Sequence, residues 1–398
     1  MPQALARAAA LVLVAVSTAV PADVSAQITF SGQVRPRTEF RDPATPDGGS
    51  LAFTGMRTRL AASVLTQGGA RAFIQIQDVR LFGEEANTLG DYSADGLDVH
   101  QAWLLLGDQE AGASFKVGRQ EVALGGERLI GAVGWAHQGR SFDGVRVGVR
   151  PTTKLAVDGL ALQLSESAAP ARNADALLWG AYGVLNPGGD QSLDLFVLTQ
   201  RERGPGGDTD QVTLGARHVG TTGPVSYRVE GSLQRGTRQD RDVSAHMFGA
   251  RVGASGSSGS VTLWYDYLSG TVTGSDEVGA FETLYATNHK FYGFADLFTD
   301  IPTHTGGRGL QDLALKGSTR AGPWSLAADL HRFFVARGGG LDGRHLADEL
   351  DLTFSRRLPS GVGLTTGFSW VLEGGALEPV RGIRDDVFFG YVMLDLTF

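Results

Sequence analysis

The chain has 398 residues, 56 glycines, no cysteine and a formal net charge of −8. The modest acidic charge argues against nucleic acid as a partner, because proteins that bind nucleic acid present a strongly basic surface. Without cysteine, an exported chain needs a source of stability other than disulfides, and a closed ladder of backbone hydrogen bonds is one.

Residues 1–26 have the features of a cleaved secretory signal. An early cation precedes an apolar run over 8–20, and Val24-Ser25-Ala26 places small or compact residues at positions −3 and −1 of a signal-peptidase site. The run is shorter than the roughly 20 apolar residues of a spanning helix, which argues against a membrane anchor. We expect the mature chain to begin at Gln27, with cleavage after Ala22 as the weaker alternative.

The remaining residues, 27–398, are expected to form a single domain built from strands. Apolar and polar residues alternate in segments bounded by Gly, Pro, Asn and Asp, and no apolar stretch approaches the length of a membrane-spanning helix. Eighteen strands are predicted, at 28–41, 53–66, 70–82, 97–107, 112–121, 139–150, 153–165, 176–186, 191–203, 209–220, 224–237, 241–254, 260–270, 309–321, 324–337, 345–357, 361–373 and 387–398. The number is even, as single-chain bacterial barrels require, although one missed hairpin would change it to sixteen or twenty.

Several of these segments separate cleanly into an apolar and a polar face. In 224–237, for example, Val229 and Leu233 lie opposite Arg228 and Glu230. A soluble β-sandwich also alternates, with its apolar face inside. The export signal and the many long strands favour the inverted arrangement, an all-β transmembrane antiparallel barrel with its apolar face toward outer-membrane lipid and its polar face toward water.

The final segment, 387–398, places Phe388, Val392 and Leu394 on one face and ends with Phe398. A strand that closes on a carboxy-terminal aromatic resembles the last strand of bacterial outer-membrane barrels, whose terminal aromatic is read by the assembly machinery. The resemblance implies that the chain resides in the outer membrane and that Phe398 contacts this machinery.

The connections differ in length. Short ones such as 67–69 are typical of periplasmic turns, whereas 83–96, 122–138 and 271–308 are long enough to be extracellular loops or to enter the lumen. The last is rich in aromatic residues and is predicted to be a plug, a lid or a binding loop.

Arginine pairs two residues apart point to one side of their strands. Arg35 and Arg37 form one pair and Arg57 and Arg59 another; with Leu60 facing lipid, Arg57 and Arg59 face the lumen. A lipid-facing arginine at mid-depth would cost about 2–4 kcal/mol, which supports this assignment.

Two interpretations of these arginines stay open. In one they are structural and pair with Glu39, Asp78 or Asp143 inside a polar lumen. In the other they form an electropositive lining for an anionic solute.

A second group of arginines lies between residues 117 and 149. Arg119 is at a strand end, Arg128 is in a long connection, and Arg140 and Arg146 begin the next strand close to Asp143. They are predicted to converge at one rim or constriction, where the planar guanidinium suits bidentate binding of carboxylates.

The run GRQEVALGGERL, the tryptophan after it, the run GRSFDGVRV and the segment 281–296 together resemble the alginate-export family of outer-membrane porins. The alternation around 56–60 is also similar. The resemblance implies a monomeric 18-stranded barrel with an arginine-rich, anion-selective channel and occluding loops. Matching positions imply that the pore-lining or substrate-binding residues are Arg59, Arg119, Arg128, Arg140, Asp143 and Arg146. Arg57 is added to this set because its strand parity places it in the lumen.

The expected function is passage of an anionic carbohydrate, such as an alginate-like uronate polymer or its fragments, with the direction left open. A general or small-anion uptake porin is the alternative, and a barrel enzyme is less favoured. No cofactor motif or catalytic serine elbow is found. His289, Lys290 and Asp296 are better explained by turn and capping bonds than by metal ligation.

Overall fold

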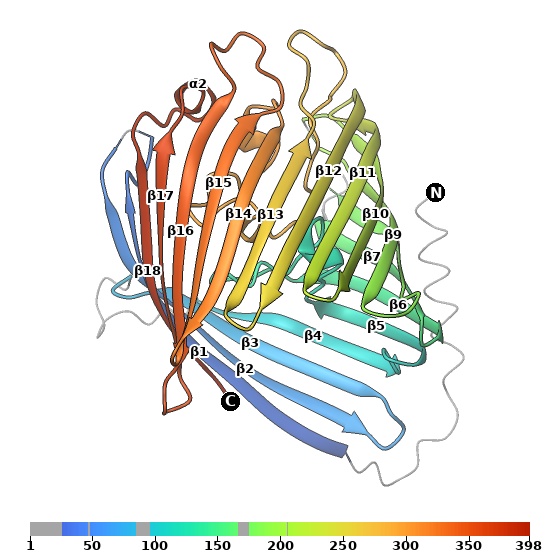
Figure 1. The fold of residues 1–398 in the computed structure, drawn as a ribbon. Coiled ribbons are helices and arrows are strands. Elements are labelled where there is room, and N and C mark those ends of the chain that lie inside the picture. The colour runs from blue at the N-terminus through green and yellow to red at the C-terminus, as the bar shows by residue number, and fades with distance from the viewer. Residues whose placement is uncertain (1–25, 47, 85–95, 166–174, 205) are drawn as a thin grey trace.

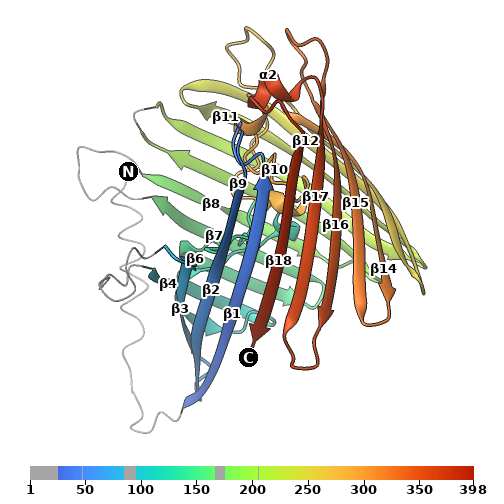
Figure 2. The same ribbon diagram turned by 90° about the vertical axis from the view of Figure 1, so that its left-hand side faces the viewer.

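The computed structural model describes residues 26–398 except 47, 85–95, 166–174 and 205. Its strands form one closed antiparallel sheet of eighteen, in which neighbours in the chain are neighbours in space and the last strand pairs with the first (Figures 1 and 2). The predicted fold class and strand number are therefore confirmed. The predicted signal segment lies, apart from Ala26, outside the described residues.

The strands match the expected segments to within a few residues. They are β1 (Ala26–Asp42), β2 (Leu51–Thr66), β3 (Arg71–Leu81), β4 (Leu97–Gly107), β5 (Gly112–Gln120), β6 (Phe142–Thr152), β7 (Leu155–Ser165), β8 (Ala176–Leu185), β9 (Gln191–Glu202), β10 (Thr209–Thr222), β11 (Val225–Arg238), β12 (Arg241–Gly256), β13 (Gly259–Leu268), β14 (Leu310–Ala321), β15 (Trp324–Val335), β16 (His345–Arg357), β17 (Gly363–Glu373) and β18 (Val387–Thr397). Short helical turns are η2 (Gly125–Glu127), η3 (Asn288–Lys290), η4 (Thr303–Thr305) and α2 (Leu377–Arg381). In the described part of the chain, no helix has the length and apolar character needed to cross a membrane.

The barrel is apolar outside and polar inside. On β2, Leu60 is 50% exposed whereas Arg57 is 4% exposed, so the two faces are assigned as the alternation predicted. On β18 the outward face carries Phe388, Val392 and Leu394, all exposed. This inversion follows from the two solvents, since lipid favours apolar side chains and the lumen favours polar ones.

The barrel closes through the carboxy-terminal residue. The Phe398 N–H donates to the Gly32 carbonyl at 3.0 Å, and the Gly32 N–H donates to the Phe398 carbonyl at 2.8 Å. The Phe398 ring lies over Gly32, where a Cβ would come within 2.5 Å of the ring. Glycine at this position therefore makes room for the terminal aromatic.

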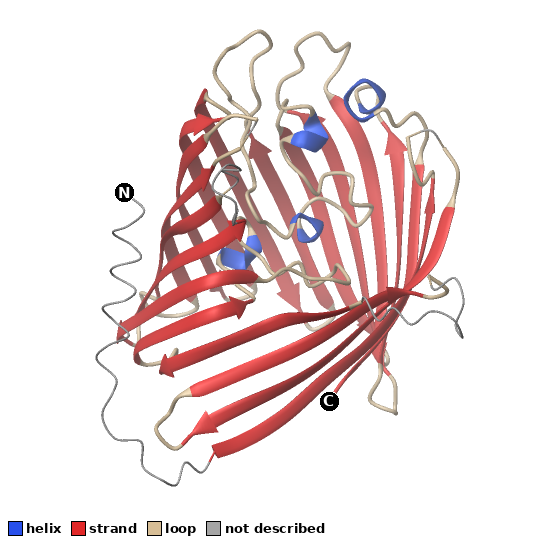
Figure 3. Cartoon of the chain, turned by 180° about the vertical axis from the view of Figure 1, so that it is seen from behind, coloured by secondary structure: helices blue, strands red, loops and turns tan. Residues whose placement is uncertain are grey.

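Two loops enter the barrel (Figure 3). We call 121–141, between β5 and β6, the short lumen loop, and 269–309, between β13 and β14, the long lumen loop. They pair through backbone hydrogen bonds of 2.9 Å from the Gly131 N–H to the Tyr285 carbonyl and from the Tyr285 N–H to the Leu129 carbonyl. Four aromatic side chains of the long lumen loop, those of Phe281, Phe291, Tyr292 and Phe298, are buried in an apolar cluster. The aromatic connection predicted to be a plug or lid therefore lies within the barrel.

Candidate channel lining and lumen plug

The inward-facing charges are separated around the barrel. The basic sector, on β1 to β6, includes Arg35, Arg37, Arg57, Arg59, Lys116, Arg146 and Arg150, together with Glu39 and, just after β5, Glu121. The acidic sector, on β13 to β18, includes Asp266, Asp312, Asp329, Glu349, Asp351 and Asp395, together with Lys316 and His331. The lumen is thus a mixed-charge tube whose cations and carboxylates lie mainly on different strands.

The basic sector binds the short lumen loop through its carbonyl groups. Arg35 donates to the carbonyls of Gly134 (2.7 Å), Trp135 (3.1 Å) and Ala136 (3.0 Å). Arg37 donates to the Trp135 carbonyl at 2.6 Å, and Arg57 donates to the carbonyls of Gly134 and Ala136 at 3.3 and 3.2 Å. All three guanidinium groups are buried beneath the loop they hold.

Arg59 occupies a separate polar cluster. It donates to Glu121 at 3.2 Å and to Gln77 at 2.7 Å, and its Nη2 lies 2.9 Å from His100 Nε2. Ser141 Oγ lies 3.3 Å from His100 Nδ1 and 3.4 Å from Nε2. A hydroxyl at nearly equal distances from both ring nitrogens lies along neither lone pair, so this serine, histidine and glutamate lack the alignment that activates a nucleophile.

The acidic sector binds the long lumen loop through its N–H groups. The Ala295 N–H donates to Glu349 Oε1 at 2.7 Å, and the Phe294 N–H donates to Asp351 Oδ2 at 3.2 Å. Gly293 has φ +80°, and a Cβ there would come within 2.4 Å of the Glu349 carboxyl group. Glycine is needed here both for the left-handed conformation and for the close approach of the carboxylate.

Arg128, from the short lumen loop, reaches the far wall. Its guanidinium lies 2.5 Å from Asp266 and 3.1 Å from Glu230, and it donates to the Tyr292 hydroxyl at 2.9 Å. Burial alone would lower the pKa of Arg128, but Asp266, Tyr292 and Glu230 outweigh it and raise that pKa. Arg128 is therefore a fixed charge that joins the short lumen loop to the acidic sector.

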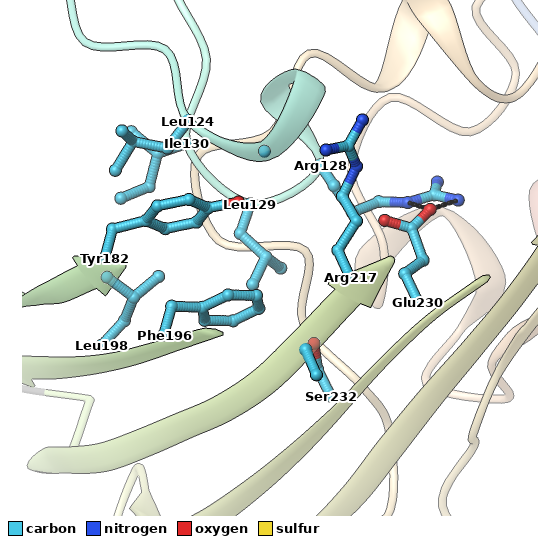
Figure 4. A pocket seen from close by; sticks show the side chains of 12 residues that line it. Leu124, Arg128, Leu129, Ile130, Tyr182, Phe196, Leu198, Arg217, Glu230 and Ser232 are labelled. Atoms are coloured by element: carbon cyan, nitrogen blue, oxygen red, sulfur yellow. Dashed lines mark hydrogen bonds and ion pairs between the residues drawn. The ribbon is translucent and has the colours of Figure 1, made fainter. Parts of the chain in front are cut away.

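Figure 4 shows Arg128 and Arg217 beside Glu230 at one end of a small cavity, with Tyr182 and Phe196 at the other end. The cavity holds about 20 Å³, room for about one water molecule. A sugar ring does not fit, so this cavity is a gap beside the plug and not a substrate site.

The other two inward arginines of the predicted set also have partners. Arg140 donates to the carbonyl of Tyr285 and, at 3.3 Å, to that of Ala286, so it joins the two lumen loops. Burial lowers the pKa of Arg140. Arg146 lies inside the barrel, 3.1 Å from Asp158 on β7.

Arg119 and Asp143 do not lie where the sequence analysis placed them. They form a cross-strand pair, 2.9 Å apart, on the same face as Val117 and Val145. That face carries the exposed apolar side chains of β5 and β6, while Gln120 points inward. Their expected place in the lumen lining is corrected: the pair lies on the outside of the barrel, where each charge neutralises the other.

Glu39 and Asp78 were the other two acidic partners considered for the arginines, and only Glu39 pairs with one of them inside the barrel. Arg37 pairs with Glu39 inside the barrel at 2.6 Å, as one interpretation proposed. Asp78 instead pairs with Arg80, two residues along β3, at 2.6 Å.

Several charged residues of the lumen were not selected from the sequence. Lys116 and Arg150 belong to the basic sector, and Arg217, Arg228 and Arg251 face the lumen from β10 to β12. The signal was available for Arg228, which lies opposite the apolar face of its strand in the sequence pattern. It was also available for Lys116 and Arg150, which alternate with valines of β5 and β6. Arg217 and Arg251 lie in segments whose small residues blur the alternation.

His289 and Asp296 are hydrogen-bonded at 2.7 Å, and the His289 ring stacks on Trp135 with centroids 4.3 Å apart. This pair therefore takes part in packing the two lumen loops together. Lys290 bonds Glu127 of the short lumen loop.

Solved structures share this fold at low sequence identity. OccK9 (OpdG) of Pseudomonas aeruginosa superposes with a TM-score of 0.66 at 15% identity, covering 94% of this chain and 98% of that one. OpdK of the same organism, solved with vanillate, gives 0.60 at 12% identity, with 93% and 98% covered. OccAB4 of Acinetobacter baumannii gives 0.64 at 9% identity, with 95% and 100% covered.

Sequence comparison gives a more specific result. No curated protein matches the chain in sequence. The alginate export family model matches residues 26–304, which is more than half of the chain and includes both lumen loops up to 304. The match agrees with the resemblance found in the runs around Arg128 and Arg140. The chain is thus an outer-membrane β-barrel that belongs to the alginate export family.

Proposed function

We propose that this barrel is a channel for anionic carbohydrate, an alginate-like uronate polymer or its fragments, with the basic sector as its binding surface. The observation that carries the proposal is the excess of cations on the inner face of β1 to β6. An electropositive wall raises the local concentration of anions and speeds their entry. The family match supports a channel of this kind.

The cations of the basic sector are placed to bind carboxylates in succession. Lys116 and Arg146 are direct cross-strand neighbours, and Arg150 follows on the same face of β6. Arg146 and Arg150 share one carboxylate, Asp158, at 3.1 Å each, so the three cations exceed their acidic partner. Several weak sites of this kind hold an anionic polymer without trapping it, and the direction of net movement is set by supply at either end.

The test is single-channel recording in planar bilayers. Wild-type protein is expected to show an anion-biased reversal potential and block by galacturonate oligomers, and Arg146→Gln with Arg150→Gln is expected to weaken both. Arg119→Gln, on the outer face of the barrel, is the matched control and leaves both unchanged. Anion selectivity without oligomer block would favour the alternative, a small-anion porin, and the absence of selectivity would reject the proposal.

We also propose that the chain acts as a monomer in contact with outer-membrane lipid, and that Phe398 is the residue its assembly machinery reads. The supporting observations are the exposed apolar outer face and a Phe398 side chain that is 64% exposed. Slower membrane insertion of Phe398→Ser, with no change in channel properties once inserted, is the expected result.

A further inference from the structure

We propose that Arg35, Arg37 and Arg57 form a carboxylate-binding site that the short lumen loop conceals, and that an acidic oligosaccharide binds there by displacing the loop's carbonyl groups. The proposal rests on the proposed function, because it uses the same class of ligand. It adds that the ligand itself opens the plug.

The three guanidinium groups have more positive charge than their surroundings neutralise. Arg35 and Arg57 lie directly opposite one another in the β1–β2 ladder, where like charges repel. Arg37 has Glu39 at 2.6 Å. Arg57 donates to Gln33 at 2.8 Å, a neutral side chain that separates it from the nearest acid on β18.

Apart from Glu39 on Arg37, the groups that now occupy the site are neutral. Carbonyl oxygens of residues 134–136 accept the hydrogen bonds of all three arginines. A carboxylate is a stronger acceptor, because a hydrogen bond between two ions is roughly twice as strong as a neutral one and a guanidinium binds a carboxylate with two parallel bonds. The Arg35 Nε–H, buried and without a hydrogen-bond partner, supplies a further donor for such a ligand.

The loop segment that covers the site can move as a unit. Hydrogen bonds from the Ala136 N–H to the Val133 carbonyl (3.1 Å) and from the Arg140 N–H to the Ala132 carbonyl (2.7 Å) close within the segment 132–140. Displacement leaves these bonds intact. What it breaks includes the arginine contacts, which the ligand replaces, and the stacking of Trp135 against Arg37 (3.8 Å) and His289 (4.3 Å). It also breaks the hydrogen bond from Gln77 to the Gln138 carbonyl (2.9 Å) and the bonds of Val133 and Arg140 to the long lumen loop.

A single thiol reports displacement directly. The chain has no cysteine, and His137, a residue of the loop whose side chain lies against Gly55 of β2, is only 9% exposed, so His137→Cys supplies one label site that is shielded while the loop is in place. The labelling rate with a charged maleimide is measured on protein in detergent with galacturonate tetramer, with maltotetraose as the uncharged control. We expect the galacturonate tetramer to raise the rate about tenfold, maltotetraose to leave it unchanged, and high salt to abolish the response because ions screen the charges.

Variants of the site separate binding from general loosening. In the His137→Cys background, Arg35→Gln with Arg57→Gln is expected to label fast without ligand and to gain nothing from it. Arg57→Lys, which keeps the charge but loses the bidentate geometry, should respond weakly and covers the case in which the double variant does not fold. Arg119→Gln, which removes a charge from the outer face of the barrel, should respond as the parent does.

The outcomes distinguish this inference from the proposed function. If the galacturonate tetramer blocks current but leaves labelling at position 137 unchanged, the concealed site is rejected and the channel function stands. If it neither blocks current nor alters labelling, both are rejected. A rise that maltotetraose reproduces would also reject the carboxylate site.

Discussion

The basic and acidic sectors hold the two lumen loops through opposite ends of the peptide group. Guanidinium groups of β1 and β2 donate hydrogen bonds to carbonyls of the short lumen loop, whereas carboxylates of β16 accept them from N–H groups of the long lumen loop. Both sectors therefore use their charged side chains in the same structural role, to bind the backbone of one lumen loop. Each sector supplies the polarity that a folded-in loop needs, because buried backbone groups must be paired.

The two sectors differ in how far their charged side chains remain exposed to the solution. Asp312 and Glu349 are 0% and 1% exposed, so the acids of the acidic sector lie largely beneath the plug. The Arg146 side chain keeps 22% exposure, and Arg150 beside it also remains partly accessible. The comparison teaches that the acids serve mainly to build the plug, while Arg146 and Arg150 of the basic sector also meet the solution, which is why we assign the open binding positions to the basic sector.

Arg128→Met is expected to give the largest effect, because Arg128 is the residue of the short lumen loop that crosses to the acidic sector. Its removal leaves Asp266 without its cation and leaves Glu230 with only the longer contacts to Arg228 (3.5 Å) and Arg251 (3.8 Å). Loss of one partner from a buried ionic cluster costs about 3–5 kcal/mol. Hydrogen exchange of peptides from both lumen loops should show this loss, while β7 and β8 exchange as before. Unchanged exchange in the loops would mean that Arg128 does not join the sectors.

Gly293→Ala should come next, because it breaks the contact between the long lumen loop and the acidic sector without removing a charge. Gly293 has φ +80° and lies against the Glu349 carboxyl group, so a methyl group there is strained as well as crowded. The expected cost is about 1–3 kcal/mol in local opening, read by hydrogen exchange over 290–298. Gly307→Ala, which also has a positive φ but open space around it, is the control that isolates the crowding.

Glu282→Gln tests whether a carboxylate of the long lumen loop behaves like those of the acidic sector. Burial raises the pKa of Glu282 despite Arg238 at 3.2 Å, so folding favours its protonated form. That stabilisation is present at low pH and is lost as pH rises through the raised pKa. At pH 7 we expect the long lumen loop to exchange its amide hydrogens somewhat more slowly in Glu282→Gln than in wild type. Near pH 4 we expect the two proteins to exchange at the same rate. Faster exchange of the long lumen loop in the variant than in wild type at pH 7 would contradict this prediction.

The fold was predictable because the barrel pattern is local. Leu60 against Arg57, or Val229 against Arg228, sets the face of a strand from two adjacent residues, and turn residues mark its ends. The number of strands and their order then follow, since each pairs with its neighbour in the chain. The lumen position of Arg57 and Arg59 came from the same local rule.

The site was less predictable because it depends on how loops fold back. Nothing in the sequence pattern shows that Arg35 meets carbonyls about a hundred residues away, or that Arg128 reaches Asp266 across the barrel. Arg119 and Asp143 were misplaced for a different reason. Their place near a strand end and the family resemblance put them at the constriction, whereas parity with Val117 and Val145 would have placed them outside.

The smallest expected effect belongs to that outward pair, and it sharpens the comparison of sectors. Arg119 and Asp143 are cross-strand partners whose side chains are 38% and 58% exposed, so Arg119→Gln should change stability by no more than about 1 kcal/mol. It should leave the reversal potential unchanged, because its charge lies outside the lumen. Arg146→Gln removes the same charge from the inner face of the next strand and should move the reversal potential toward cations. If the two variants shifted selectivity equally, the potential would respond to net charge and not to which face carries it, and the assignment of binding to the basic sector would lose its support.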